Sequence, residues 1–211
     1  MRKLCAVLLA LVLLTLNVGA MAAGGSFGAL ASAESYLSFM AFSRSGLIEQ
    51  LEYEGYSRQD AEYAADHCGA DWFEQAARKA ESYLSFMPFS TSRLIEQLEY
   101  EGFTHEQAVY GAGQTGADQT SQALNKAKSY LSFTAFSYQG LIKQLEYEGF
   151  SHSEAVDAAD RCGADWNEQA VKKAKSYLSF MSFSHSRLVS QLEYDGFTHS
   201  QAEYGATQAG N

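Results

Sequence analysis

The chain has 211 residues, a hydrophobic fraction of 46% and a single proline, which favour one or two folded helical domains over a disordered chain. The formal net charge is −10, and residues 26–211 carry 13 basic and 25 acidic side chains, a net charge of −12. Such a surface repels phosphate backbones, so we exclude nucleic acid as a partner and expect a basic or mixed protein surface instead.

Residues 1–25 are predicted to be a signal peptide or an N-terminal membrane anchor. Arg2 and Lys3 precede an apolar run from Leu4 to Leu16, and small residues around Met21 suit a cleavage site. If it is not cleaved, the segment 4–23 is just long enough to span a bilayer and would be the chain's membrane contact. Both alternatives place the remainder outside the cytoplasm. The small residues 23–26 are expected to form a flexible spacer.

The rest of the chain is a tandem repeat. The stretch Leu47–Gly55 (Leu-Ile-Glu-Gln-Leu-Glu-Tyr-Glu-Gly) returns almost unchanged three more times, each copy 47 residues after the last and with no insertion. A fixed period of this size is typical of repeat architectures. We divide the chain into repeats at residues 33–79, 80–126, 127–173 and 174–211.

The first helix of a repeat is clearest at Trp72–Met87, where Asp71 can cap the start and alanines recur on one side. The earliest copy, around Leu30–Met40, is expected to be shorter at its start. The second helix is predicted at about Arg44–Glu54, between a serine N-cap and a glycine C-cap. The four C-cap glycines are Gly55, Gly102, Gly149 and Gly196.

The third helix follows at once, because each glycine is succeeded by a capping signal. Ser57 with Asp60 starts this helix in the first repeat, and Thr104 with Gln107 does so in the second. We therefore predict an all-α fold of tandem three-helix, helix-turn-helix-like repeats. Base reading in DNA would need arginine and lysine on the third helix, which carries Asp60, Glu62 and Asp66 instead.

Alternate repeats resemble each other most, which predicts that the repeats pair. Trp72 recurs as Trp166 at the start of a first helix, while the equivalent place between repeats 2 and 3 holds Gln119. We predict a first module at residues 26–113, a linker at 114–118 and a second module at 119–211. The two tryptophans are expected inside the modules, where each would fix the first helix of the second repeat.

The second helix also carries polar residues that lie off its buried Leu47–Leu51 stripe and could form a repeated binding face. Tyrosine is a good interface residue because it is rigid and amphipathic. The alternative is that these tyrosines pack between repeats. The candidate contacts are Gln50, Glu52 and Tyr53, and their copies Gln97, Glu99, Tyr100, Gln144, Glu146, Tyr147, Gln191, Glu193 and Tyr194.

The sequence predicts no metal site, no cofactor and no enzyme activity. His105, His152 and His199 fall one per repeat, without the paired spacing of metal ligands. No nucleophile elbow, phosphate loop or zinc-protease helix is present, and near-identical copies do not form one asymmetric pocket. Cys68 and Cys162 are interpreted as small buried thiols, with a disulfide between modules or between chains as the alternative.

The stretches Gly140–Ser151 and Cys162–Ala170, preceded by Ala-Lys-Ser-Tyr-Leu-Ser-Phe, closely resemble the repeat of the Ltp family of host cell surface-exposed lipoproteins. The match covers about residues 33–210. The resemblance implies paired helix-turn-helix-like repeats on the outer face of a Gram-positive cell membrane. One departure is that Cys5 lies at the start of the apolar run and no cysteine follows the run, so the lipid-attachment cysteine of the family is missing.

The resemblance further implies superinfection exclusion, in which a prophage-encoded protein stops the DNA of another phage from entering the cell. The partner would then be a protein of the injection machinery, with a tape-measure-type phage protein as the candidate. The alternative function is a general cell-surface or envelope protein-binding module unrelated to phage. Without the lipid, retention would depend on an uncleaved segment 4–23, and otherwise the protein is secreted.

Overall fold

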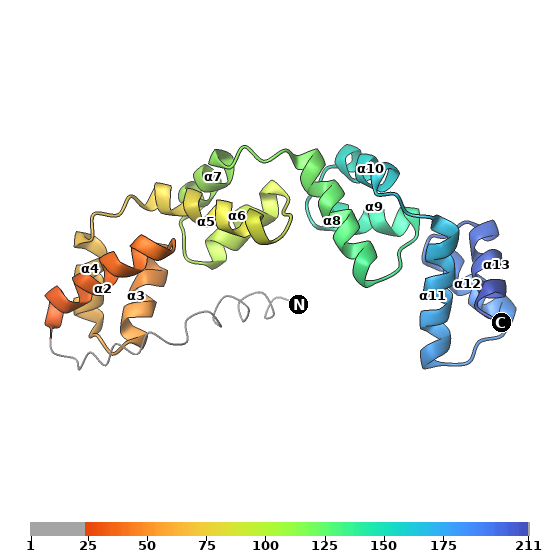
Figure 1. Cartoon of the computed structure of the whole chain (residues 1–211), viewed down its shortest axis with the longest axis horizontal. Helices are drawn as coiled ribbons and strands as arrows, with labels where there is room; N and C mark the ends of the chain where they lie inside the picture. The colour runs from red at the N-terminus through yellow and green to blue at the C-terminus, as the bar shows by residue number, and fades with distance from the viewer. Residues whose placement is uncertain (1–23, 211) are drawn as a thin grey trace.

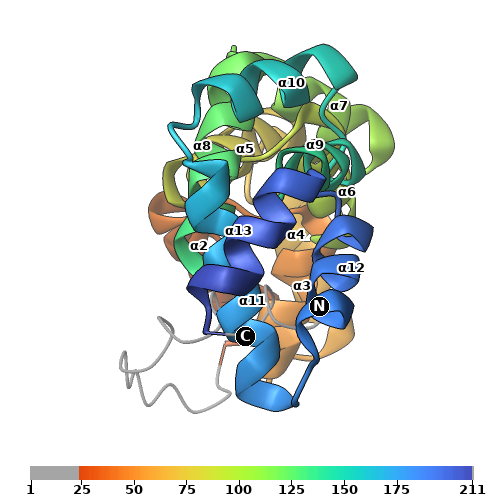
Figure 2. The same cartoon turned by 90° about the vertical axis from the view of Figure 1, so that its right-hand side faces the viewer.

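The computed structural model describes residues 24–210, and within this range it contains twelve α-helices and no strand. The helices form four three-helix units that follow one another along an arch (Figure 1), and Figure 2 shows the arch from the side of the fourth unit. This confirms the predicted all-α repeat fold. Residues 1–23, which carry most of the predicted signal or anchor and Cys5, lie outside the described residues.

The predicted repeat boundaries were wrong, because residues 33, 80, 127 and 174 fall inside the long first helices. In the structure the four repeats are residues 25–67, 72–114, 119–161 and 166–208, and each has a long first helix and two short ones. The first helices are α2 (Gly25–Phe39), α5 (Trp72–Phe86), α8 (Gln119–Phe133) and α11 (Trp166–Phe180). The second helices are α3 (Arg44–Tyr53), α6 (Thr91–Tyr100), α9 (Tyr138–Tyr147) and α12 (His185–Tyr194). The third helices are α4 (Arg58–His67), α7 (His105–Gln114), α10 (His152–Arg161) and α13 (His199–Gln208).

Local capping explains where the helices begin and end. Asp71 accepts hydrogen bonds from the N–H groups of Phe73 and Glu74, at 2.9 and 3.3 Å, and so starts α5. Reciprocal capping boxes begin α7, α10 and α13. The four predicted C-cap glycines have φ between 86° and 96°, a conformation that strains any residue with a Cβ.

The prediction of a shorter first helix was wrong, and so was the prediction of a flexible spacer for Gly25 and Ser26, because α2 begins at Gly25 and has 15 residues like its copies. Ala29 and Ala33 of α2 are fully buried against α4. Packing against α4 therefore stabilises the start of α2, which has no capping side chain. Ser26 also donates a 2.7 Å hydrogen bond to Asp60, which lies in the first turn of α4.

Every repeat has its own hydrophobic core. In the first repeat Leu47, Ile48 and Leu51 of α3 are almost completely buried between the alanines of α2 and those of α4. The other three repeats contain equivalent clusters around Leu94, Leu141 and Leu188. Alanine on the flanking helices lets them approach the leucines closely, which explains how so short a unit encloses a core.

The three joints between consecutive repeats share one contact. The N-terminus of a second helix meets the C-terminus of the second helix in the next repeat, so that these helices follow one another head to tail. Ser43, Ser90 and Ser137 donate hydrogen bonds of 2.5–2.6 Å to the carbonyls of Glu101, Glu148 and Asp195. The same hydroxyls accept from a backbone N–H of their own helix, which caps it.

The outer joints, between repeats 1 and 2 and between repeats 3 and 4, add an apolar contact to the serine hydrogen bond. Trp72 and Trp166 begin α5 and α11, and each half-buried ring packs against the core of the preceding repeat. Gly46 and Gly140 stand where the helices meet, and a Cβ on either would lie within 3.4 Å of a carbonyl oxygen of the next repeat. Glycine therefore permits the close approach at the outer joints.

The central joint, between repeats 2 and 3, is polar. Gln119 and Gln122 of α8 accept hydrogen bonds of 3.0 and 3.3 Å from the N–H groups of Thr91 and Phe89. Arg93, which replaces the glycine of the outer joints, donates to the carbonyl of Tyr147 at 2.7 Å. Residues 115–118 form a connection between α7 and α8. The division into two paired modules stays a prediction.

Candidate functional site

A polar network beneath each second helix positions the candidate glutamines. Gln97 of α6 donates to the hydroxyl of Tyr83 on α5 at 3.2 Å, and that hydroxyl donates to the carboxylate of Glu101 at 2.5 Å. The same arrangement occurs at Gln50, Gln144 and Gln191, with Tyr36, Tyr130 and Tyr177 as the tyrosines. The glutamine amides are thus engaged inside the repeat, and they tie the second helix to the first.

In repeats 2, 3 and 4 a lysine of the first helix completes the network. Lys79 pairs with Glu101 at 2.9 Å, Lys126 with Glu148 at 3.3 Å, and the ammonium group of Lys173 lies 3.7 Å from Asp195. Burial and the hydrogen bond to Asp195 raise the pKa of Tyr177 to about 12. The hydroxyl of Tyr177 therefore acts as a hydrogen-bond donor at neutral pH.

The first repeat has a serine in place of that lysine. Ser32 stands at the lysine position, and its Oγ lies 3.0 Å from the hydroxyl of Tyr56, where the other repeats have phenylalanine. Glu54, the acid of this network, accepts from Tyr36 but forms no ion pair with a lysine among residues 24–210. Burial raises the pKa of Glu54 above its ordinary value.

The four candidate tyrosines, in contrast, project into solvent. Tyr53, Tyr100, Tyr147 and Tyr194 end the second helices, and each is between 68% and 88% exposed. The alternative interpretation, in which these rings pack between repeats, is therefore wrong. The guanidinium group of Arg93 lies 5.2 Å from the ring of Tyr147, which holds that tyrosine near the central joint.

The candidate glutamates lie next to these tyrosines, and each pairs with an arginine or a histidine of the third helix. Glu52 lies 3.1 Å from Arg58, and Glu99, Glu146 and Glu193 lie 2.6–2.8 Å from His105, His152 and His199. Exposed pairs of this kind contribute little to stability. They do fix the direction of the glutamate side chains, so an exposed tyrosine and an oriented carboxylate recur once per repeat.

Other predicted sites can be located as well. The Cys68 and Cys162 thiols are half-buried and free, and they donate to the carbonyls of Ala65 and Ala159. Within residues 24–210, no group of three metal-ligating side chains comes together. In the same range no helix combines the length and the apolar character needed to cross a membrane.

The sequence reasoning missed the polar network because it assigned the glutamines to the outer face. A signal was available in the spacing: Tyr83, Gln97 and Glu101 keep the same separations in all four repeats. It also missed Lys79 and its copies, because their acidic partners lie on another helix.

The comparisons with known proteins agree with the repeat boundaries seen in the structure. The family model described as host cell surface-exposed lipoprotein (Lipoprotein_Ltp) matches residues 28–68, 71–112, 118–160 and 165–208. Each matched segment covers the three helices of one repeat. No curated protein and no solved structure matches the chain.

Proposed function

Because the chain belongs to the family of host cell surface-exposed lipoproteins that all four repeats match, we propose that it excludes superinfecting phages at the cell surface. In this proposal the protein acts outside the cytoplasm and binds a protein of the phage injection machinery, so that phage DNA does not enter. A tape-measure-type protein is the candidate partner. The proposal needs no catalytic step, only a binding surface held near the membrane.

The exposed tyrosine beside an oriented glutamate, present once in each repeat, is the observation that supports binding. Tyrosine provides apolar contact area and a hydroxyl at a low entropic cost, which is why it is enriched at interfaces. Four copies on one chain allow several weak contacts to act together on an extended or repetitive partner. The net charge of −12 in residues 26–211 favours a partner segment with basic residues.

The proposal is tested by expressing the full-length chain in a susceptible host and challenging the cells with a panel of phages. We expect phage adsorption to remain normal while DNA entry falls, because the protein acts after attachment. Normal adsorption together with normal DNA entry across the panel would favour a general surface-binding module instead.

Removing residues 1–25 provides the matched control. The shortened protein is expected in the cytoplasmic fraction, and it should not protect the cells even when it is present in the same amount. Protection by the shortened protein would contradict a role at the cell surface. Fractionation of cells carrying the full-length chain also distinguishes an anchored protein from a secreted one.

A further inference from the structure

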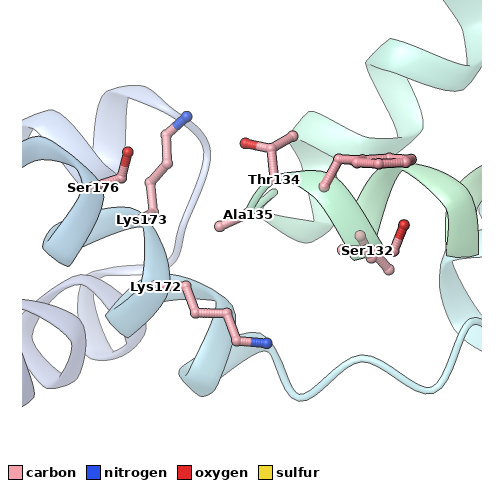
Figure 3. A pocket seen from close by; sticks show the side chains of 8 residues that line it. Ser132, Thr134, Ala135, Lys172, Lys173 and Ser176 are labelled. Atoms are coloured by element: carbon pink, nitrogen blue, oxygen red, sulfur yellow. The ribbon is translucent and has the colours of Figure 1, made fainter.

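The two outer joints carry equivalent pockets that the proposed function does not use. The pocket at the second outer joint has a volume of about 310 Å³ and lies between the C-terminal end of α8 and the middle of α11 (Figure 3). The pocket at the first outer joint lies between α2 and α5 and has about 160 Å³. The larger one is lined by Leu131, Ser132, Phe133, Thr134, Ala135, Lys172, Lys173 and Ser176.

An exposed phenylalanine stands at the edge of each pocket. Phe133 is the last residue of α8 and is 87% exposed, although it belongs to the Ser-Tyr-Leu-Ser-Phe stretch that all repeats share. Its copies Phe39, Phe86 and Phe180 are between 76% and 83% exposed. A large aromatic side chain that stays exposed in every repeat adds little to the core and is typical of an interaction site.

A basic side chain lies on the opposite wall of the larger pocket. Figure 3 shows Lys172 and Lys173 projecting from α11 on the side that faces the end of α8. Lys173 approaches Asp195, but Lys172 is exposed and forms no ion pair with any residue of the range 24–210. In a strongly acidic protein, a cation without a counter-charge beside an exposed aromatic ring favours an acidic and partly apolar ligand.

The smaller pocket is narrowed by an arginine. Arg78 of α5 occupies the position of Lys172, and it donates a 3.0 Å hydrogen bond to the carbonyl of Leu37 near the end of α2. The guanidinium group therefore pairs with a free carbonyl at the C-terminal end of α2, where a positive charge is favourable. At the central joint the same position holds Asn125, which has no charge. The pocket between α8 and α11 is therefore the one best suited to an acidic ligand.

We propose that the pocket between α8 and α11 binds an acidic peptide segment of a partner protein, with a carboxylate on Lys172 and an apolar side chain against Phe133. Its volume is at the lower end of the range for ligand pockets, about 300–1,000 Å³, and suits a few side chains of a peptide. A flat anionic membrane would not enter a recess between two helices. This site does not depend on the proposed function, which uses the tyrosines of the second helices.

The probe is a fluorescent peptide in which aspartate and leucine alternate, and binding to the purified full-length protein is followed by fluorescence anisotropy. We expect Lys172→Glu and Phe133→Ser each to weaken binding roughly tenfold. Two matched variants should leave binding unchanged. Lys128→Glu makes the same charge change on an exposed lysine of α8 outside the pocket, and Phe180→Ser removes the equivalent phenylalanine of the fourth repeat, which lines neither pocket.

A third variant tests the assignment by a gain of binding. Arg78→Lys should free the carbonyl of Leu37, open the smaller pocket and raise the number of peptides bound per chain from one towards two. Three outcomes would overturn the proposal: equal binding of a peptide in which lysine and leucine alternate, equal losses in Lys172→Glu and Lys128→Glu, or binding of anionic vesicles but not of the acidic peptide. The peptide measurements involve no phage, so their failure would leave the proposed exclusion function unaffected.

Discussion

The outer joints and the central joint both link the second helices of consecutive repeats, but they do so with different side chains. All three use a serine hydroxyl that joins the end of one second helix to the next. The outer joints add a tryptophan and a glycine that permits close packing, whereas the central joint adds glutamines and an arginine. Apolar contact stabilises an interface through burial, while exposed hydrogen bonds contribute less because water competes for them.

This difference implies that the joints of a repeat protein can differ in stability even when its period is uniform. At the outer joints the Oε1 atoms of Gln75 and Gln169 are buried without a partner among the described residues, although the equivalent Gln122 accepts a hydrogen bond. Packing therefore stabilises the outer joints although each buries a glutamine oxygen that accepts no hydrogen bond. We expect repeats 1 and 2, and repeats 3 and 4, to unfold as pairs.

Replacing the tryptophan of an outer joint should have the largest effect. Trp166→Ala removes the ring that packs on the third core and meets Tyr138 edge to face at a centroid distance of 5.5 Å, and we expect a loss of about 2–3 kcal/mol. The matched central variant, Gln119→Ala, should cost about 1 kcal/mol or less. Urea unfolding followed by circular dichroism measures both.

The same variant also tests whether the repeats pair. The chain has two tryptophans, so in Trp166→Ala the fluorescence reports on Trp72 and the first outer joint alone. We expect the urea midpoint of the Trp72 fluorescence to be unchanged. The part of the circular dichroism transition that comes from repeats 3 and 4 should move to lower urea. A common shift of both signals would show that all four repeats unfold together and would contradict the division into pairs.

A smaller difference in stability is expected between replacing Glu54, the network acid of the first repeat, and replacing Glu101, the network acid of the second. Glu101→Gln leaves Lys79, whose side chain is 11% exposed, without its counter-charge, and should cost about 2 kcal/mol. Glu54 has no such lysine, and burial raises its pKa in the folded state. Its ionised form therefore lowers stability at neutral pH, and that cost disappears as the pH falls below the unfolded value near 4.5.

Glu54→Gln should accordingly stabilise the protein slightly at neutral pH and make no difference at acidic pH. Thermal unfolding at several pH values, with Glu101→Gln measured beside it, gives the comparison. Destabilisation by Glu54→Gln at neutral pH would show that the ionised carboxylate is favoured in the fold, which contradicts the direction of its pKa shift.

The smallest effect is expected at the buried glutamines. Gln75→Leu replaces a buried, unpartnered oxygen by an apolar group and should be neutral or stabilising by up to about 1 kcal/mol. Gln122→Leu removes the acceptor of the Phe89 N–H group and should destabilise by about 1 kcal/mol. If calorimetry gave both variants the same sign, the polar and apolar character assigned to the two kinds of joint would be incorrect.

Helix boundaries were largely predictable because they depend on neighbouring residues. Ser57, Thr104 and the four C-cap glycines act within a few positions, and the structure contains the helix starts and ends that they predict. The start of α2 was not predictable in this way. It has no side-chain cap, and its first turn is held by packing and by Asp60, which lies 34 positions from Ser26.

The candidate site was predicted in part for the same reason. The tyrosines and glutamates were assigned to the surface because they lie off the leucine stripe, and the structure exposes the tyrosines. The glutamines lie off that stripe too, yet they bond to a tyrosine of another helix, which the period of one helix cannot reveal. Joint contacts and the pocket beside Phe133 arise between repeats and need the packed structure.

The most direct test of the proposed binding surface replaces its four tyrosines together. A variant with serine at Tyr53, Tyr100, Tyr147 and Tyr194 should fold normally, because these rings are exposed. Each tyrosine at an interface contributes about 1–2 kcal/mol, so we expect phage DNA entry to be restored while adsorption and the amount of surface protein stay unchanged. Tyr63→Ser with Tyr204→Ser, on the third helices, should leave exclusion intact. Full exclusion by the four-tyrosine variant would contradict the assignment of this surface.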